Sequence, residues 1–276
     1  MTSVLPLDYA QLQMFYNAFQ ASLNKRLANG LNFLAAYTYA NNMGNADGNV
    51  GGFIQNAYRP DLEHGPVVPD LRQRFTISYL YELPVGRNRH FLANASAVVD
   101  AFLGGWELAG ITTAQSGEAL TASMSSDLSN TSSFSYRPNQ IANPYDFSFN
   151  IPSQQTDFGC SRPGHQTLDC WFNQAAFLAP PLAPGQVSAH EFGNSRLGNL
   201  RGPDLVTFDL ALQKNFKITE RQLIEFRAEM FNLFNHPNFG LPGGGSQISV
   251  DVPGGAAITN TSIDNRQIEF ALKYAF

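Results

Sequence analysis

The last eleven residues, 266–276, read RQIEFALKYAF, and they decide the fold class of this chain. Large apolar side chains stand at every second position, and the residues between them are polar, charged or small. The apolar set is Ile268, Phe270, Leu272, Tyr274 and Phe276. Side chains of a β-strand point alternately to its two faces, so this period of two predicts a strand with one apolar and one polar face. The alternation reaches Phe276, and we expect that residue to be held in a sheet.

Six further segments show the same alternation. The seven predicted strands are 14–26, 31–41, 72–83, 106–117, 204–216, 223–234 and 266–276, each with 11 to 13 residues. Strands of globular proteins usually have only ~5–6 residues. A tilted strand needs ~9–11 residues to cross the hydrocarbon core of a bilayer. Strand length therefore favours a membrane barrel.

The connections between these strands alternate in length. In chain order they are 27–30, 42–71, 84–105, 118–203, 217–222 and 235–265. Short periplasmic turns that alternate with long external loops are typical of an up-and-down barrel. We therefore predict an all-β, antiparallel, up-and-down transmembrane β-barrel segment of about seven long strands, with 118–203 as a long external loop. The connection 84–105 is long for a turn and is expected to fold a short element of its own.

Charged residues inside the predicted strands lie almost wholly on one strand face. The residues predicted to face the lumen are Asp209, Glu225, Arg227, Glu229 and Lys273. Lys214 and Lys25 are exceptions near strand ends, where a lysine can extend its ammonium group toward water at little cost. Acid/base catalysts would need a cleft, whereas the same residues on a lumen wall form a ladder of lateral ion pairs.

Composition excludes several classes of protein. The formal net charge of −5 argues against a nucleic-acid partner, which would normally require a basic patch. No apolar run is long enough for a transmembrane helix, and the first residues lack the features of a signal peptide. The five histidines have no metal-ligand spacing, so we expect no metal and no cofactor. No Ser-His or paired-acid arrangement stands out, and we expect no enzymatic activity.

Two cysteines, Cys160 and Cys170, lie in the turn-rich stretch FGCSRPGHQTLDCW (158–171). This spacing favours a loop disulfide and therefore an oxidising compartment, with two free thiols as the alternative. A structural zinc site lacks ligands, because only His165 lies between the cysteines.

The long loop 118–203 also contains aromatic residues that could stack on a sugar or an aromatic ligand. The candidates are Phe134, Tyr136, Tyr145, Trp171 and Phe172. The alternative, which we favour, is that they pack the loop over the mouth of the barrel.

Two other classes of protein remain open at this point. A soluble carbohydrate-binding β-sandwich would also have alternating strands. However, a loop as long as 118–203 is difficult to house in a compact soluble domain. The second alternative is an outer-membrane barrel enzyme.

The stretch NLRGPDLVTFDLALQKNFKITERQLIEFRAEMFNLFNHPNFGLP (199–242) resembles the C-terminal part of the barrel of TonB-dependent outer-membrane receptors. More narrowly, it is similar to the Oar-like subgroup, as are YNAFQASLNKRLANGLNFLAAYTYAN (16–41) and DLRQRFTISYLYELPVG (70–86). The resemblance covers essentially the whole chain. It implies a barrel that encloses a plug domain and imports scarce nutrients, energised through an inner-membrane TonB complex.

We expect residues 1–276 to be the C-terminal portion of such a barrel, without plug domain or signal peptide and inactive in transport alone. The expected location is the outer membrane of a Gram-negative-type envelope. The expected partners are outer-membrane lipid, the missing N-terminal strands and plug, and the TonB complex only through the missing region.

The terminal strand resembles the signal that the barrel-assembly machinery reads by adding it as a strand to a sheet edge. Ile268, Phe270, Leu272, Tyr274 and Phe276 would carry this signal. The alternative is that they simply face lipid, with the aromatic residues in the interfacial girdle.

Overall fold

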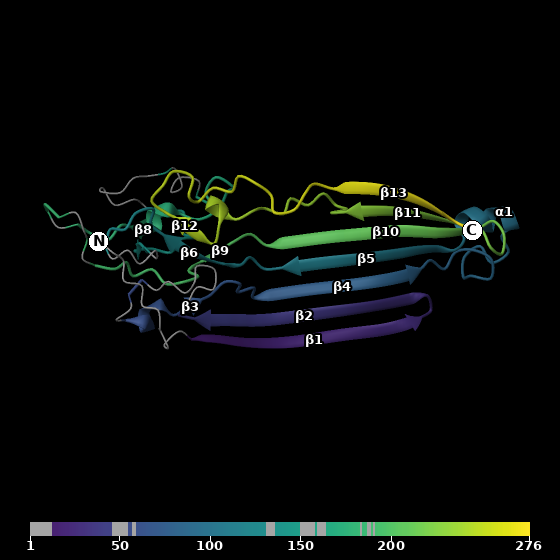
Figure 1. The fold of residues 1–276 in the computed structure, drawn as a ribbon, viewed down its shortest axis with the longest axis horizontal. Coiled ribbons are helices and arrows are strands. Elements are labelled where there is room, and N and C mark those ends of the chain that lie inside the picture. The colour runs from purple at the N-terminus through teal and green to yellow at the C-terminus, as the bar shows by residue number, and fades with distance from the viewer. Residues whose placement is uncertain are drawn as a thin grey trace.

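A sheet of seven long antiparallel strands forms the body of the computed structural model (Figure 1). The structure describes residues 13–45, 55–56, 59–130, 136–149, 158, 164–182, 184–186, 189 and 191–276. The long strands are β1 (Met14–Ala28), β2 (Leu31–Gly44), β4 (Gln73–Glu82), β5 (Trp106–Gln115), β10 (Leu205–Lys217), β11 (Leu223–Phe231) and β13 (Gln267–Ala275). The predicted fold class is confirmed, and the strand ends differ from the predicted ones by a few residues.

The long strands lie side by side in chain order, β1-β2-β4-β5-β10-β11-β13, which is the up-and-down arrangement. A short strand, β3 (Gly65–Pro66), adds to the end of β2. Within the described residues, β1 pairs only with β2 among the long strands, and β13 pairs only with β11. The sheet is therefore open, with two edges that have no neighbour here.

Chain connections divide the sheet into a turn end and a loop end. At the turn end, β1 and β2 are joined through Asn29 and Gly30, whose φ angles are 54° and 77°. Two positive φ angles in succession are what a tight hairpin needs, because their twist matches that of the strands. A Cβ atom on Gly30 would also lie 2.9 Å from the carbonyl oxygen of Glu82, so a larger residue is excluded there.

The connection from β4 to β5 folds a short helix, α1 (Ala97–Leu103), at the turn end (Figure 1). Ser96 caps it, because its hydroxyl oxygen accepts a hydrogen bond from the backbone N–H of Val99 at 3.3 Å. This helix is the element expected in 84–105. Nowhere in the described part of the chain is a helix long and apolar enough to cross a membrane.

At the loop end, the long connections form a packed unit that we call the loop assembly, made of residues 116–130, 136–149, 164–182, 191–204 and 232–266. Two small sheets organise it: β12 (Gln247–Ser249), β6 (Ala119–Ser123) and β9 (Leu200–Arg201) in one, and β7 (Asn139–Gln140) with β8 (Phe177–Leu178) in the other. The 3₁₀ turns are η1 (Pro60–Glu63), η2 (Gln174–Ala176) and η3 (Pro242–Gly244), of which η2 and η3 lie in the assembly.

The loop assembly contains the hydrophobic core of the described residues. Leu120, Phe172, Leu200 and Ile248 are almost fully buried in it. Residues of the connection 235–265 enter the same core, and Val250 donates a backbone hydrogen bond to Ser123. The predicted long loop 118–203 is therefore a folded unit, because it buries apolar side chains against a second connection far away in the sequence.

Candidate functional site

One face of the long sheet is mostly apolar. Antiparallel register places residues that face each other across two strands on the same side of the sheet. Ile224 lies opposite Tyr274, and Phe226 lies opposite Leu272. The same side continues across the other strands with Phe208, Leu210, Leu212, Leu108, Ile77, Tyr79, Phe33, Phe19 and Leu23.

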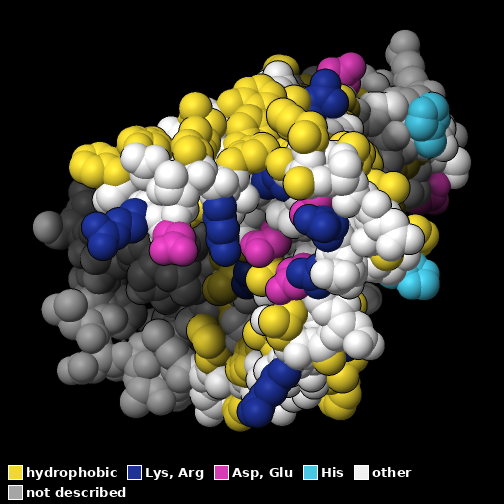
Figure 2. Space-filling view, turned by 90° about the vertical axis from the view of Figure 1, so that its right-hand side faces the viewer, with side chains coloured by type: hydrophobic (Ala, Val, Ile, Leu, Met, Phe, Trp, Pro, Cys, Tyr) yellow, Lys and Arg dark blue, Asp and Glu magenta, His cyan; other side chains and the backbone are white. Residues whose placement is uncertain are grey.

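Large apolar side chains on this face lack a cover among the described residues. Phe270 and Leu272 on β13 are 71% and 73% exposed, and Phe19 on β1 is 63% exposed. Viewed from the turn end, hydrophobic side chains gather along the top of the molecule, and charged side chains gather in the middle of the view below them (Figure 2). A β-sandwich would press a second sheet onto such a face. This sheet instead presents it outward, as a barrel does to lipid.

The opposite face is polar and contains a ladder of ion pairs. The register puts Asp209, Glu225, Arg227, Glu229 and Lys273 on this face. Arg227 binds both neighbouring carboxylates of its own strand, Glu225 at 2.7 Å and Glu229 at 3.3 Å. Farther along the face, Gln213 donates a 2.6 Å hydrogen bond to Glu107 of β5. Glu225, Glu229 and Glu107 are therefore held in ion pairs or hydrogen bonds along the wall, whereas acid/base catalysis would need carboxylates that can exchange protons with a substrate.

A cavity of about 390 Å³ opens on the polar face at the loop end. Arg74, Thr207 and Asp209 line it together with Asp264 and Gln267. Asp209 is held in place, because one of its carboxylate oxygens accepts a hydrogen bond from the backbone N–H of Asn232 at 2.9 Å. Residues of the sheet and of the loop assembly thus meet at this cavity.

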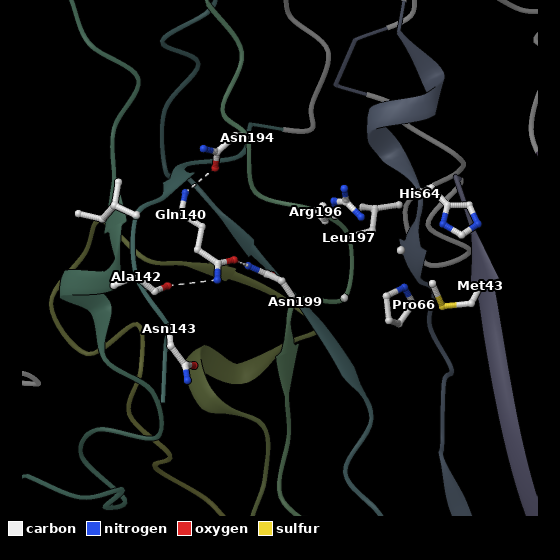
Figure 3. A pocket seen from close by; sticks show the side chains of 13 residues that line it. Met43, His64, Pro66, Gln140, Ala142, Asn143, Asn194, Arg196, Leu197 and Asn199 are labelled. Carbon is white, nitrogen blue, oxygen red and sulfur yellow. Dashed lines mark hydrogen bonds between the residues drawn. The ribbon is translucent and has the colours of Figure 1, made fainter. Parts of the chain in front are cut away.

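A larger, open cavity of about 820 Å³ lies within the loop end (Figure 3). Figure 3 shows Gln140, Asn143 and Asn199 on one side of it and His64 on the other. The amide groups are linked to one another: Asn199 donates a 3.0 Å hydrogen bond to Gln140, which in turn donates to the carbonyl of Ala142 at 3.2 Å. Arg196 also lines the cavity and is exposed. Among the described residues, the lining combines neutral amides with one guanidinium group and the imidazole of His64, and it includes no carboxylate.

The loop assembly is tied to the sheet through the buried carboxylate of Asp70, which precedes β4. Arg201 of β9 contacts one carboxylate oxygen at 2.5 Å, and Arg72 contacts the same oxygen at 3.1 Å. The other oxygen accepts a hydrogen bond from the backbone N–H of Asn42, near the end of β2, at 2.7 Å. This one side chain therefore connects two strands of the wall to the loop assembly.

The aromatic residues that were candidates for ligand stacking lie in different surroundings. Phe172 is fully buried and packs edge-to-face against Phe177, with ring centroids 6.1 Å apart. Trp171 donates its indole N–H to the carbonyl of Arg201 at 2.8 Å, and the hydroxyl of Tyr145 accepts a hydrogen bond from the backbone N–H of Arg201 at 2.7 Å. Tyr136 packs against the core from its edge. Phe134 lies outside the described residues.

Only one of the two cysteines of the predicted disulfide lies within the described residues. Cys170 is disulfide-bonded and buried in the core of the loop assembly. Cys160 lies outside the described residues, so its pairing with Cys170 stays a prediction.

In the part of the chain that the structure describes, no cluster of three or more His, Cys, Asp or Glu side chains is placed to hold a metal ion. Sequence reasoning missed the Asp70 cluster and the amide-lined cavity. Asp70 and Arg201 are 131 residues apart and belong to no periodic pattern, so no local signal could have identified them.

Glu118, directly before β6, is expected to make the stability of the loop assembly depend on pH. Its carboxyl group is half-buried, and burial raises its pKa. A raised pKa in the folded state means that stability is highest below the ordinary carboxyl pKa and falls as the pH rises through the folded pKa. Glu118→Gln removes the buried charge, and we expect it to raise the melting midpoint at pH 8 and to leave it unchanged at pH 4, as measured by calorimetry in detergent micelles.

Glu220→Gln, at an exposed turn, is the matched control and should change neither midpoint. Equal midpoints for Glu118→Gln and the unmodified chain at pH 8 would contradict the prediction.

Comparison with known proteins connects this geometry to a family. The model of the family described as "Outer membrane beta barrel domain" matches residues 4–269. No curated protein and no solved structure matches the chain. The matched region includes β1, β2, β4, β5, β10 and β11 and the first residues of β13, with their apolar outer face and polar inner face. The chain therefore belongs to the outer membrane beta barrel domain family, and its location is the outer membrane.

Proposed function

We propose that this chain is the C-terminal part of the barrel of a TonB-dependent nutrient receptor, similar to the Oar-like subgroup, and that it does not transport alone. The observation that carries the proposal is the open sheet of the described residues, in which β1 and β13 each have a long neighbouring strand on one side only. Unpaired backbone groups are very unfavourable in hydrocarbon, so a lipid-embedded wall needs neighbours to close. The missing neighbours would be the N-terminal barrel strands, which enclose the plug.

The loop assembly supports a receptor rather than a purely structural barrel. It is a packed unit with its own core and with open cavities, fixed to the wall through Asp70. We assign the first contact with cargo to the amide-lined cavity of Figure 3. The side chain of Phe172 is fully buried and cannot stack on a ligand, so the prediction that it contacts cargo is wrong.

We also propose that the chain is not an enzyme. Glu225 and Glu229 are both bound by Arg227, which supports a structural ladder. Esterase and peptidase assays on membrane-inserted protein test this point, and turnover that is lost in Glu225→Gln would contradict it.

Binding of TonB provides the test of the receptor proposal. The full polypeptide that contains residues 1–276, extended through the in-frame coding sequence upstream, should bind the purified periplasmic domain of TonB in a pull-down. Residues 1–276 alone, in the same detergent, should not bind it. A full polypeptide that carries no plug and does not retain TonB would contradict the proposal.

Phe276 is the residue whose removal should affect assembly most directly. It is 94% exposed and stacks on Tyr274, with ring centroids 5.7 Å apart. An edge strand with exposed aromatic side chains is suited to capture by strand addition. Deleting Phe276 from the full receptor is expected to lower the amount inserted in the outer membrane several-fold, as measured on membrane fractions.

Ala275→Ser, which changes the neighbouring position on the other strand face, is the control and should insert normally. Unchanged insertion after deletion of Phe276 would leave only the lipid-facing role for this residue.

A further inference from the structure

The connection between β4 and β5 places α1 against the apolar face of the sheet. Lys214 of β10 is on that face, directly opposite Trp106 of β5. Its ammonium group donates a hydrogen bond to the carbonyl oxygen of Gly104, the residue that follows α1. The indole N–H of Trp106 donates to the carbonyl oxygen of Phe102 in the last turn of α1 at 2.9 Å. The C-terminal end of α1 is thus fixed to the outside of the wall.

These contacts explain a charged residue on an apolar surface. The ammonium nitrogen of Lys214 lies 5.8 Å from the ring centroid of Trp106 and 5.1 Å from that of Phe216, and the residue is only 4% exposed. Free carbonyl groups at a helix C-terminus and aromatic ring faces both attract a cation. The helix end therefore covers a charge that would otherwise face hydrocarbon, at the turn end where a bilayer interface would lie.

The helix has two different sides. Val98, Val99, Phe102 and Leu103 follow a helical spacing of one, three and four residues and form one apolar stripe. Val98 and Phe102 are 69% and 65% exposed. The opposite side is small or polar, with Ala97, Asp100 and Ala101.

The residues just before α1 are also exposed, and they include both apolar and basic side chains. Phe91 and Leu92 are also exposed, and the exposed Arg87 and His90 precede them. Arg89, between these two, is instead paired with Glu82 of β4 at 3.2 Å. Apolar side chains next to cationic ones are suited to the boundary between acyl chains and phosphate headgroups.

We propose that residues 87–103 form an interfacial membrane anchor, in which the apolar stripe of α1 enters the acyl-chain boundary of the leaflet at the turn end and Arg87 meets phospholipid headgroups. The occupant of this surface is bilayer phospholipid, because the stripe continues the lipid-facing side of the sheet through the contacts of Lys214 and Trp106. The inference rests on the outer-membrane location of the sheet. In this proposal the long strands cross the membrane, and residues 87–103 lie along its surface.

Spin labels on single new cysteines test the anchor. The variants are Val98→Cys on the apolar stripe, Ala101→Cys on the opposite side of α1, and Leu272→Cys on the apolar face of β13. Each labelled full chain is reconstituted in phosphatidylcholine/phosphatidylglycerol vesicles. Collision rates of the label with oxygen, which concentrates in lipid, and with a water-soluble nickel chelate are then measured.

The expected result is a ratio of oxygen to nickel collisions that is high at 98 and 272 and several-fold lower at 101. A high ratio at 272 with a low ratio at 98 would overturn the anchor and leave the barrel intact. Low ratios at both positions would overturn the anchor together with the membrane insertion of the sheet. A label at 98 that neither reagent reaches would show that protein, such as a second copy, covers the stripe, and would also overturn the proposal.

Discussion

Replacing Asp70 with Asn is expected to lower the free energy of unfolding of the loop assembly by about 3 kcal/mol. The carboxylate is fully buried and serves Arg72, Arg201 and the backbone of Asn42 together. Removing one partner of a buried ion pair leaves the other charge uncompensated, which typically costs about 3–5 kcal/mol. The two arginine side chains are 32% and 31% exposed and can turn toward water, so we expect the lower end of that range.

Hydrogen exchange measured by mass spectrometry in detergent micelles reports the effect locally. Peptides that contain β6 and β9 should lose protection, and peptides from β10 and β11 should keep it. The control is Asp61→Asn, because the pair of Asp61 with Arg59 is more than half exposed on both sides and contributes little. Similar exchange in the two variants would show that Asp70 does not hold the loop assembly on the wall.

An arginine at position 210 is expected to destabilise the inserted sheet by about 2–4 kcal/mol, the cost of this side chain facing lipid at the middle of a bilayer. Leu210 is near the centre of β10 and lies on the apolar face, opposite Gly110 and Met230. The charged group would have to reach water from the greatest depth that the strand offers. Reversible folding of Leu210→Arg into phospholipid vesicles, titrated with guanidinium, gives the change in free energy.

Ala211→Arg is the matched control, because the next residue on the same strand points to the polar face. There it lies opposite Glu229, so the new guanidinium group has a carboxylate nearby. We expect a change close to zero. A similar loss for both variants would contradict the assignment of the two faces, and with it the lipid contact on which the proposed function depends.

The long strands could be predicted from the sequence because the face to which a strand side chain points depends only on its position along its own strand. The alternation in 223–234 and 266–276 fixes which residues share a face as soon as either segment is extended. The observed register then places Glu225 opposite Lys273 and Phe226 opposite Leu272, on the polar and the apolar side. Lys214 breaks the pattern, and the sequence led us to expect that its ammonium group reaches water near the strand end. The structure corrects this expectation, because Lys214 is buried and donates a hydrogen bond to the carbonyl oxygen of Gly104 at the end of α1.

The residues of the loop assembly gave no comparable signal. β6, with the sequence ALTAS, has no regular alternation, and all but its last residue are buried. Its partners are Leu200 and Arg201 on one side and residues 247–249 on the other. The partners of β6 are more than seventy residues away along the chain. Which long connections pack together depends on how the chain closes, and the contacting residues show no periodic pattern from which the contact could be predicted.

By itself, therefore, the sequence determined the strands, their two faces, their order and the membrane that they suit. The strands and their faces follow from the pleat of a single strand, and their order follows from connections that alternate between short and long. Only the tertiary structure decided that the long loops form a core, that Asp70 joins them to the wall, and that α1 covers Lys214. These features arise between segments that are distant in the chain. Their partners are selected by burial of apolar side chains and by charge pairing, and a local sequence pattern does not specify them.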